Sequence, residues 1–300
     1  MKTFQDKVAM RDFSRGCRVS RKRIALVPTM GYLHDGHLAL VEGAKRFADV
    51  VVVSIYVNPT QFSVNEDFDV YPRDVEGDRE KLRRAGVDAV FEPSSLYEAA
   101  PSSSATSFVV GTGEFIPGGH ETYVQVEQLQ KVLCGVSRPH FFRGVATVCA
   151  KLFNIVEPDV AVFGKKDYQQ WRIISTMVRD LDFGVEVVGM PLVREPDGLA
   201  MSSRNVRLSP DERQRALCIS RGLRTAREAI EGGAQMSPAE VQRDIAGAIQ
   251  SAGGAVDYVE VLDADNLSPV SGFAAQDTLI AVAAKFGSVR LIDNTVVRAK

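Results

Sequence analysis

Short apolar runs alternate with segments of helical periodicity through the first two thirds of the chain. Residues 24–27 and 50–57 are apolar runs of the length typical of buried strands. Between them, residues 38–47 repeat apolar side chains at the spacing of an amphipathic helix. Two strands joined by a helix over so short a stretch predict a right-handed crossover, and therefore a parallel sheet.

The same succession of helix and strand recurs further along the chain. The predicted pairs are a helix at 74–85 with a strand at 87–91, a helix at 145–156 with a strand at 160–163, and a helix at 167–181 with a strand at 185–188. Such repetition predicts an α/β fold with a Rossmann-like, doubly wound parallel sheet. Ligands bind at the carboxyl ends of the strands in such sheets, so we expect the chemistry in the loops that follow them.

The pattern changes near residue 193. Two helical segments come before three strand-like runs, at 210–231, 238–252, 256–262, 278–283 and 289–292. Helices followed by strands are typical of an α+β arrangement. We therefore predict a Rossmann-like domain at 1–192 and a second, smaller α+β lid domain at 193–300. The Ser- and Gly-rich segment 99–120 is predicted to be a surface loop inserted in the first domain.

Charge and composition exclude several kinds of partner. The net charge of −2 gives no general attraction to nucleic acid or to an anionic membrane, so an anionic substrate would have to meet a local group of cations. No apolar run reaches the roughly 18 residues of a membrane span. We therefore expect small-molecule substrates, with neither nucleic acid nor a membrane as a partner.

Two features of the chain concern its location. The four cysteines are scattered and form no C-x-x-C pair, which is typical of a protein in a reducing compartment. The first 23 residues are rich in Lys and Arg, as in organelle transit peptides, but Asp6 and Asp12 interrupt them and serine is sparse. An amphipathic first helix and a cytoplasmic location are therefore the preferred interpretation.

The most informative loop follows the first predicted strand. Gly31 and Gly36 permit tight turns, and His34 and His37 are three residues apart, a spacing that places them on one face of a helical turn. A helix N-terminus with two imidazole donors can bind phosphate oxygens and stabilise charge developing on a triphosphate. Two surface histidines or a zinc site would also fit this spacing, although the chain has only two other histidines and no cysteine nearby.

Three further polar segments stand in comparable positions. They are 58–61 with Asn58 and Gln61, 163–170 with Gly164, Lys166, Asp167 and Gln170, and 197–205 with Ser202, Ser203 and Arg204. Cationic side chains assisted by hydroxyls bind phosphate, whereas neutral amides suit a hydroxyl or carboxylate substrate. Each segment alone is equally compatible with a capped helix, a turn or a polar loop. Together, four such segments around one sheet favour a nucleotide site.

These segments resemble known signatures. TMGYLHDGH resembles the H-I-G-H signature of the nucleotidyltransferase superfamily, and MSSRN resembles its second, mobile K-M-S-K-S element. The whole set resembles the pantothenate synthetase (pantoate–β-alanine ligase) family, in the order PTMGYLHDGH, VSIYVNPTQF, YPRD, SRPHFFRGV, FGKKDYQQ, DGLAMSSRN and LIDN. The resemblance runs from about residue 20 to the end of the chain.

The resemblance implies an ATP-dependent acid–amine ligase that acts as a homodimer. The family condenses pantoate with β-alanine to give pantothenate, AMP and pyrophosphate, through a pantoyl-adenylate intermediate and with Mg²⁺ as cofactor. A covalent enzyme nucleophile is unnecessary, since adenylation itself activates the acyl group and the protein supplies positioning and charge stabilisation.

The resemblance also implies roles for individual residues. The implied catalytic residues, which would also contact ATP, are His34, His37, Lys166 and Arg204, with His37 as the position described as a proton donor. The other implied ATP-binding residues are Met30, Gly164, Asp167, Val193, Met201, Ser202 and Ser203. Asn58, Gln61 and Gln170 would bind pantoate and β-alanine, and Asp78 would help to hold Mg²⁺.

Three features depart from the common bacterial pattern of the family. Lys165 stands where those members have Glu, and Phe141 stands where they have His, so no role is assigned to His140. With the segment 99–120, these features resemble the plant-type branch of the family. Lys165 is expected to add positive charge beside the phosphates.

Two other functions remain open from the sequence. One is a nucleotidyltransferase that moves a nucleotide onto a phosphorylated metabolite, but the neutral amides of Asn58, Gln61 and Gln170 match such a substrate poorly. The other is a nucleotide-binding regulator that has lost catalysis, which the presence of His34 and His37 together with the cationic segments disfavours.

Overall fold

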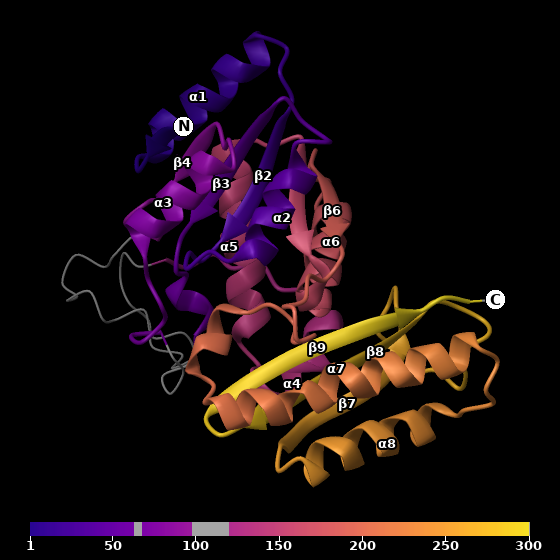
Figure 1. The fold of residues 1–300 in the computed structure, drawn as a ribbon. Coiled ribbons are helices and arrows are strands. Elements are labelled where there is room, and N and C mark those ends of the chain that lie inside the picture. Colours follow the sequence, from indigo (N-terminus) through magenta and orange to yellow (C-terminus); the bar gives the residue numbers. More distant parts are fainter. Residues whose placement is uncertain (63–67, 98–119, 300) are drawn as a thin grey trace.

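Six parallel strands form the larger sheet of the protein (Figure 1). The structure is a computed structural model that describes residues 1–62, 68–97 and 120–299. In spatial order the strands are β1 (Lys2–Phe4), β4 (Ala89–Phe91), β3 (Val50–Ile55), β2 (Ile24–Thr29), β5 (Val160–Gly164) and β6 (Glu186–Met190). From β2 the chain moves outward through β3 and β4, and then crosses to the other side of β2 to form β5 and β6. The winding therefore reverses between β2 and β5, which is the topological switch point of a doubly wound sheet.

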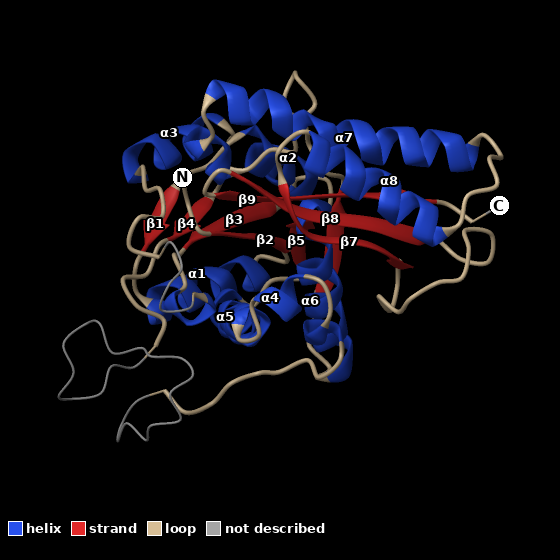
Figure 2. Cartoon of the chain, turned by 90° about the horizontal axis from the view of Figure 1, so that it is seen from below, coloured by secondary structure: helices blue, strands red, loops and turns tan. Residues whose placement is uncertain are grey.

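Helices cover both faces of this sheet (Figure 2). One face carries α1 (Lys7–Val19), α5 (Phe141–Val156) and α6 (Tyr168–Asp180), and the other carries α2 (Asp35–Ala44) and α3 (Val75–Arg84). Alternate strand residues enter the two cores: Ile24 and Leu26 pack on the α5 side, and Ala25 and Val27 pack on the α2 side. Burial on both faces explains why these strands are continuous apolar runs.

The short helices lie in the connections. They are η1 (Pro59–Gln61), η2 (Leu129–Lys131), α4 (Cys134–Ser137), η3 (Lys165–Asp167) and η4 (Ser203–Arg207). Three of them, η1, η3 and η4, hold the polar segments that the sequence analysis singled out beyond the histidine loop. Tight 3₁₀ turns after a strand direct successive side chains to different sides, so each segment can present only some of its residues to a ligand.

The C-terminal part of the chain forms an antiparallel sheet. Its strands lie in the order β7 (Ala255–Asp263), β8 (Thr278–Phe286) and β9 (Val289–Val297), and α7 (Pro210–Glu231) and α8 (Pro238–Ser251) cover one face (Figure 1). Each helix begins with a serine cap, a proline in its first turn and a glutamate that bonds back to the serine. This capping box satisfies the first N–H groups of the helix and explains where both helices start. The other face of the sheet packs against α4 and α6.

The predicted fold class, a doubly wound parallel sheet with a smaller α+β unit, is confirmed. The sequence pattern missed β1, a three-residue strand at the edge beside β4. It also ended β8 and β9 too early, and in β9 the polar residues Asp293 and Asn294 interrupt the apolar run. Most of the segment 99–120 lies outside the described residues. No described helix is long and apolar enough to cross a membrane.

A proline marks the point where β2 and β5 separate. β2 pairs with β3 from end to end, but it pairs with β5 over only two residues. Successive residues of a strand direct their backbone groups to opposite neighbours. The Ile24 carbonyl accepts from Asp159, which precedes β5, whereas the Thr29 carbonyl accepts from Tyr56, which follows β3. Pro28 has the orientation of Ile24, so it faces β5 and has no N–H to donate there.

Candidate active site

A cavity of about 790 Å³ opens where β2 and β5 separate. Its walls extend from the carboxyl ends of these strands to η4 and to β9 of the second sheet. The predicted site residues that line it are Met30, His34, His37, Asn58, Gln61, Gly164, Lys166, Asp167, Gln170, Val193, Met201, Ser202, Ser203 and Arg204. Of the predicted set, Asp78 alone is not part of its wall. The sheet topology thus brings four distant sequence segments to one place.

The histidine pair is formed at the start of α2. His34 is the N-cap of the helix, with an extended backbone, and His37 is its third residue. The His34 N–H donates to Nδ1 of His37 at 3.3 Å, and the two ring centroids are 4.0 Å apart. The imidazoles are therefore adjacent, as expected, although His34 stands at the cap and not on a helical turn.

Both imidazoles are neutral at physiological pH. Burial, the His34 ring and the Lys166 ammonium group lower the pKa of His37 to about 3. Burial and Lys166 also lower the pKa of His34, to about 4. Because Nδ1 of His37 accepts a backbone N–H, the proton of this ring is on Nε2, which can donate to a ligand. Nδ1 of His34 is buried without a partner among the described residues.

We expect acid to destabilise the fold through these two histidines. In the unfolded chain each has the ordinary pKa of 6.5, whereas in the folded protein the pKa values are about 4 and about 3. Because the folded values are lowered, the unfolded chain binds protons first as the pH falls below 6.5. Stability should therefore decline from that pH down to about pH 3. Urea unfolding at a series of pH values measures the decline.

The control for this prediction is a variant that carries His34→Gln and His37→Gln. Glutamine keeps an amide donor and acceptor but does not titrate. The variant should lose less stability than the wild type over the same acidic range. Equal losses in the two proteins would show that other groups cause the acid sensitivity.

Asp78 binds the backbone of the loop that leads from β2 to the histidine pair (residues 30–34). It is 1% exposed, and its two oxygens accept the backbone N–H groups of Tyr32 and Leu33, both at 2.7 Å. Lys81, one turn further along α3, donates to the Leu33 carbonyl at 2.8 Å. The loop needs such support because Gly31 and Tyr32 both have positive φ. These contacts give Asp78 a structural role, and they do not support the expected role in holding Mg²⁺.

The two lysines of η3 point in different directions. Lys166 lines the cavity, where its Nζ is 3.5 Å from the Asp167 carboxylate and its charge acts on both histidines. Lys165 lies with its Nζ 4.4 Å from the centre of the Trp171 ring and is not part of the cavity wall. Burial lowers the pKa of Lys165. The expectation that Lys165 adds charge beside the phosphates is therefore wrong, because its ammonium group packs over an aromatic face instead.

The segment around η4 supplies hydroxyls and a guanidinium group. Ser202 is the N-cap of η4, and its Oγ accepts the Arg204 N–H at 3.3 Å. The buried Ser203 hydroxyl is 3.3 Å from the Tyr71 hydroxyl, and the Arg204 guanidinium group lies 5.6 Å from the centre of the Tyr71 ring. Tyr71 also lines the cavity. In the sequence, the YPRD segment that contains Tyr71 was one of those that resemble the family, but no role was predicted for Tyr71.

Neutral amides line another part of the cavity. Asn58 donates to Oε1 of Gln61 at 2.9 Å and to the Gly144 carbonyl at 3.2 Å. A Cβ at Gly144 would meet the Thr60 carbonyl oxygen at 2.3 Å, so only glycine lets α5 approach η1 this closely. Apolar side chains of α5 continue this wall: Phe141, Phe142, Val145, Val148, Cys149 and Leu152. The region suits a small ligand with both polar and apolar groups.

Gln169 and Gln170 are adjacent but differ in environment. Gln169 is buried, accepts the Cys134 N–H at 3.0 Å and donates to the carbonyls of Leu129 and Val132 at 2.7 and 2.6 Å. It therefore fixes the η2–α4 connection. Gln170 is partly exposed on the same first turn of α6, and both residues line the cavity. The amide of Gln169 is thus bound to backbone groups of the fold, whereas the predicted binding residue, Gln170, is the more exposed of the two.

The described residues contain no group of three or more His, Cys, Asp or Glu side chains able to hold a metal ion. The zinc interpretation of the histidine pair therefore lacks the further ligands it would need within the described part of the chain. Lys166 beside the pair, with its positive charge, favours an anion instead.

Comparison with known proteins shows the family of this chain. The family model described as Pantoate-beta-alanine ligase matches residues 2–296. A pantoate–beta-alanine ligase of Arabidopsis thaliana is 52% identical over 299 residues, covering 97% of this chain and 96% of the relative. The pantothenate synthetase structure from Thermus thermophilus has a TM-score of 0.85 at 43% identity, covering 99% of this chain and 100% of that one.

A second structure was solved with ligands. The pantoate–beta-alanine ligase from Francisella tularensis, complexed with beta-gamma ATP and beta-alanine, has a TM-score of 0.76 at 29% identity and covers 99% of this chain and 97% of that one. The family match and the Arabidopsis relative both span nearly the whole chain. The chain described here belongs to the pantoate–beta-alanine ligase family.

Proposed function

We propose that the protein condenses pantoate with β-alanine at the expense of ATP, giving pantothenate, AMP and pyrophosphate. The observation that carries the proposal is one cavity with two kinds of wall. One kind of wall is cationic, with Lys166 near two neutral histidines and Arg204 over Tyr71, and the other joins neutral amides to an apolar helix face. The first side suits a triphosphate, and the second suits a small hydroxy acid with a branched carbon chain.

In the first step, a carboxylate oxygen of pantoate attacks the α-phosphorus of ATP and pyrophosphate leaves, which forms pantoyl adenylate. Negative charge grows on the phosphate oxygens as the bond to pyrophosphate breaks. His37 would donate its Nε2 proton in a hydrogen bond to these oxygens, and His34, Lys166 and Arg204 would complete the charge stabilisation. The residues framing ATP would be Met30, Gly164, Asp167, Val193, Met201, Ser202 and Ser203.

In the second step, the amine of β-alanine attacks the acyl carbon, AMP leaves with the electron pair of the broken bond, and the amine loses its proton. Asn58, Gln61 and Gln170 would hold the two carbon substrates in position for this attack. Holding both reactants in one cavity replaces a bimolecular encounter with an intramolecular step.

We also propose that Mg²⁺ binds together with ATP and would neutralise part of the triphosphate charge. Mg²⁺ is usually bound through substrate phosphates and waters with only one or two carboxylates from the protein. A cavity without a group of acidic ligands among its described residues fits that pattern. Asp167, which lines the cavity beside Lys166, is the carboxylate best placed to contact the hydrated ion.

The proposal also covers organisation and location. We place the domain boundary at residue 192/193, since β6 ends at Met190 and α7 starts at Pro210. The resemblance to the family supports a homodimer. A cytoplasmic location would supply ATP and keep the four unpaired cysteines reduced.

Release of AMP tests the proposed function. Purified protein with ATP, Mg²⁺ and both carbon substrates should release AMP and pantothenate in equal amounts, and omission of either carbon substrate should stop turnover. Sustained AMP release without β-alanine would contradict the ligase reaction. A stable nucleotide-linked product would instead indicate the rival nucleotidyltransferase.

Gln170→Ala is expected to raise the KM for pantoate by about tenfold, because one hydrogen bond to the substrate is worth about 1.5 kcal/mol. The fold should keep its stability, since Gln170 only lines the cavity. Steady-state kinetics with pantoate as the varied substrate measures the effect.

Gln169→Ala is the matched control for this prediction. It removes the partners of three backbone groups, so thermal unfolding should occur at a lower temperature. Its KM for pantoate should change less than that of the Gln170 variant. The reverse assignment of the two effects would show that Gln169, and not Gln170, contacts the substrate.

A further inference from the structure

β9 lies between the two sheets and has side chains on both of its faces. Val289, Leu291 and Val297 pack with α7 in the core of the second sheet. Side chains of the other parity, Ile292 and Val296, pack on hydrophobic clusters that include residues of the larger unit. Because a strand alternates its side chains, two adjacent residues of β9 can bind to different parts of the molecule.

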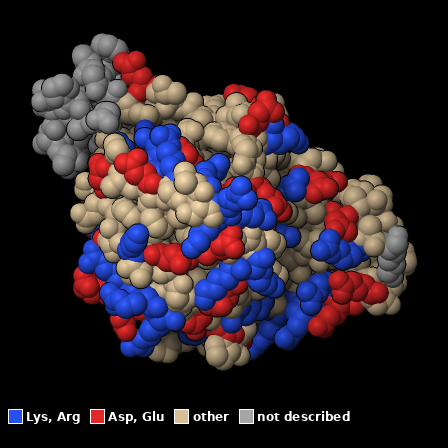
Figure 3. Space-filling view, turned by 90° about the horizontal axis from the view of Figure 1, so that it is seen from above, with Lys and Arg blue, Asp and Glu red and all other residues tan. Residues whose placement is uncertain are grey.

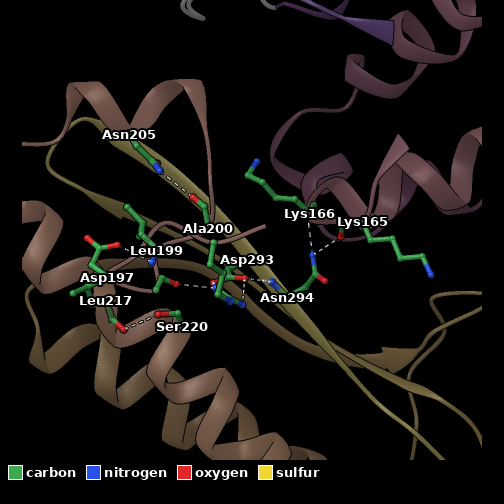
Figure 4. A network of polar contacts seen from close by, with 12 residues as sticks. Lys165, Lys166, Asp197, Leu199, Ala200, Asn205, Leu217, Ser220, Asp293 and Asn294 are labelled. Carbon is green, nitrogen blue, oxygen red and sulfur yellow. Dashed lines mark hydrogen bonds and ion pairs between the residues drawn. The ribbon is translucent and has the colours of Figure 1, made fainter. Parts of the chain in front are cut away.

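Asn294 is the residue of β9 that reaches the phosphate-binding loop. Its Nδ2 donates to the carbonyl oxygen of Lys165 at 3.0 Å and to that of Lys166 at 2.9 Å (Figure 4). Both hydrogens of the amide group are thus used by consecutive carbonyls of η3. Asn294 is 9% exposed, and its backbone N–H donates to the Asp293 carboxylate at 2.7 Å. Burial and this bond fix the position of the Asn294 residue.

Asp293 connects β9 to the segment before η4. Its carboxylate accepts two bonds from the guanidinium group of Arg194, at 2.7 and 3.0 Å. The Arg194 side chain also donates to the Gly198 carbonyl at 3.1 Å. The Arg194 backbone forms an antiparallel β-bridge with Ala200, the residue before Met201. A bidentate pair of this kind fixes orientation as well as distance. Adjacent residues of one strand therefore hold both cationic segments of the cavity.

The orientation of η3 decides which of two consecutive lysines meets the cavity. In Figure 4 the side chains of Lys165 and Lys166 leave the loop in opposite directions, with Asn294 beneath the backbone between them. The Lys165 side chain packs closely between Gly189 and Trp171. A Cβ at Gly189 would lie 2.6 Å from the Lys165 Cε and 2.6 Å from the Trp171 ring. A rotation of the loop would remove Lys166 from the histidine pair, and two carbonyls bound to one amide resist that rotation.

We propose that Asn294 is a positioning residue that fixes η3 so that Lys166, and not Lys165, faces the phosphates. This inference rests on the proposed function, because it assigns Lys166 to ATP. Asn294 contacts the backbone of the loop and acts through Lys166. The second sheet thereby contributes to a phosphate site whose cation comes from the first.

Asn294→Ala is expected to weaken ATP binding and to lower kcat/KM for ATP by about 10- to 100-fold, the cost of a misplaced catalytic group. The KM for pantoate should change little. Asn294→Asp keeps the size of the side chain but replaces both donors with acceptors, and it should lose at least as much. Titration calorimetry with ATP and Mg²⁺ measures binding, and AMP release measures turnover.

Gln242→Ala, on α8 beside the second sheet, is the matched control. The Gln242 amide donates to the Val259 carbonyl at 3.0 Å and to the Glu260 carboxylate at 3.1 Å, and it does not line the cavity. This variant also loses two hydrogen bonds donated by one side-chain amide, so it reports the effect of lost stability alone. ATP affinity should stay at the wild-type value.

A double variant tests the route through Lys166. If Asn294 acts by placing this lysine, adding Asn294→Ala to Lys166→Ala should weaken ATP binding by no more than about twofold. The inference would be overturned if Asn294→Ala weakened ATP binding as much in the Lys166→Ala background as in the wild type. Wild-type ATP affinity in both Asn294 variants would also overturn it. A wild-type protein that binds ATP but forms no pantothenate would contradict the proposed function alone, since ATP affinity still tests Asn294.

Discussion

Replacing Lys166 with alanine is expected to lower kcat/KM for ATP by about 100- to 1000-fold, the usual cost of removing one group that stabilises transition-state charge in a closed site. The side chain lines the cavity, and its charge acts on both histidines. Steady-state AMP release with ATP as the varied substrate measures the effect. The melting temperature should change little, because the ion pair of the ammonium group with the partly exposed Asp167 is weak.

Lys165→Ala provides an internal control one residue away. Both variants remove one positive charge from η3, so a general electrostatic effect would lower both activities alike. Lys165 packs over Trp171 outside the cavity wall. Its variant should therefore keep ATP kinetics near the wild-type value, with a small loss of stability from the missing cation–π contact. Similar losses of activity in both variants would contradict the assignment of Lys166.

Replacing Asp78 with alanine is expected to destabilise the fold by about 2 to 5 kcal/mol, because two buried N–H groups lose a charged acceptor. Those N–H groups belong to Tyr32 and Leu33, directly before His34, so the histidine pair should lose its geometry and turnover should fall more than tenfold. Urea unfolding gives the free energy, and AMP release gives the turnover.

Added Mg²⁺ separates this structural role from metal binding. If Asp78 held the metal, Asp78→Asn would weaken Mg²⁺ binding, and a higher Mg²⁺ concentration would restore activity at unchanged stability. If Asp78 anchors the loop, the variant should unfold at lower urea and Mg²⁺ should not restore it. Restoration by Mg²⁺ with wild-type stability would return the metal role to Asp78.

The sequence predicted those parts of the site whose signals are local. His34, His37 and Lys166 stand in short segments directly after strands, and the parallel topology brings the ends of those strands to one edge of the sheet. The alternation of helix and strand predicted that topology without knowledge of any contact. The polar segments after the strands and the alternation of helix and strand can both be recognised from residues that are close together in the sequence.

The remaining parts depend on contacts between distant positions. Asn294 bonds to carbonyls 128 and 129 residues away, Tyr71 meets Ser203 across 132 residues, and Asp78 holds N–H groups 45 and 46 residues before it. A single sequence contains no periodicity that reports such pairs. The direction of the Lys165 side chain was hidden for the same reason, because it depends on how η3 is held from another strand.

Figure 3 shows Lys and Arg side chains interspersed with Asp and Glu over the face it presents, as the small net charge suggests. Mixed charge of this kind gives no broad field that would attract polyanions. On the proposed function, the attraction for ATP would therefore come from the cationic groups inside the cavity.

Pro28 has a further consequence for the dynamics of the sheet. β2 and β5 share only two register pairs, so fewer ladder bonds cross this seam than cross between β2 and β3. The free energy of local opening is low where few backbone bonds must break together. Slow fluctuations that widen the substrate crevice should therefore concentrate at this seam and leave the rest of the sheet intact. One imino acid in the central strand influences both where the crevice begins and where the sheet yields most easily.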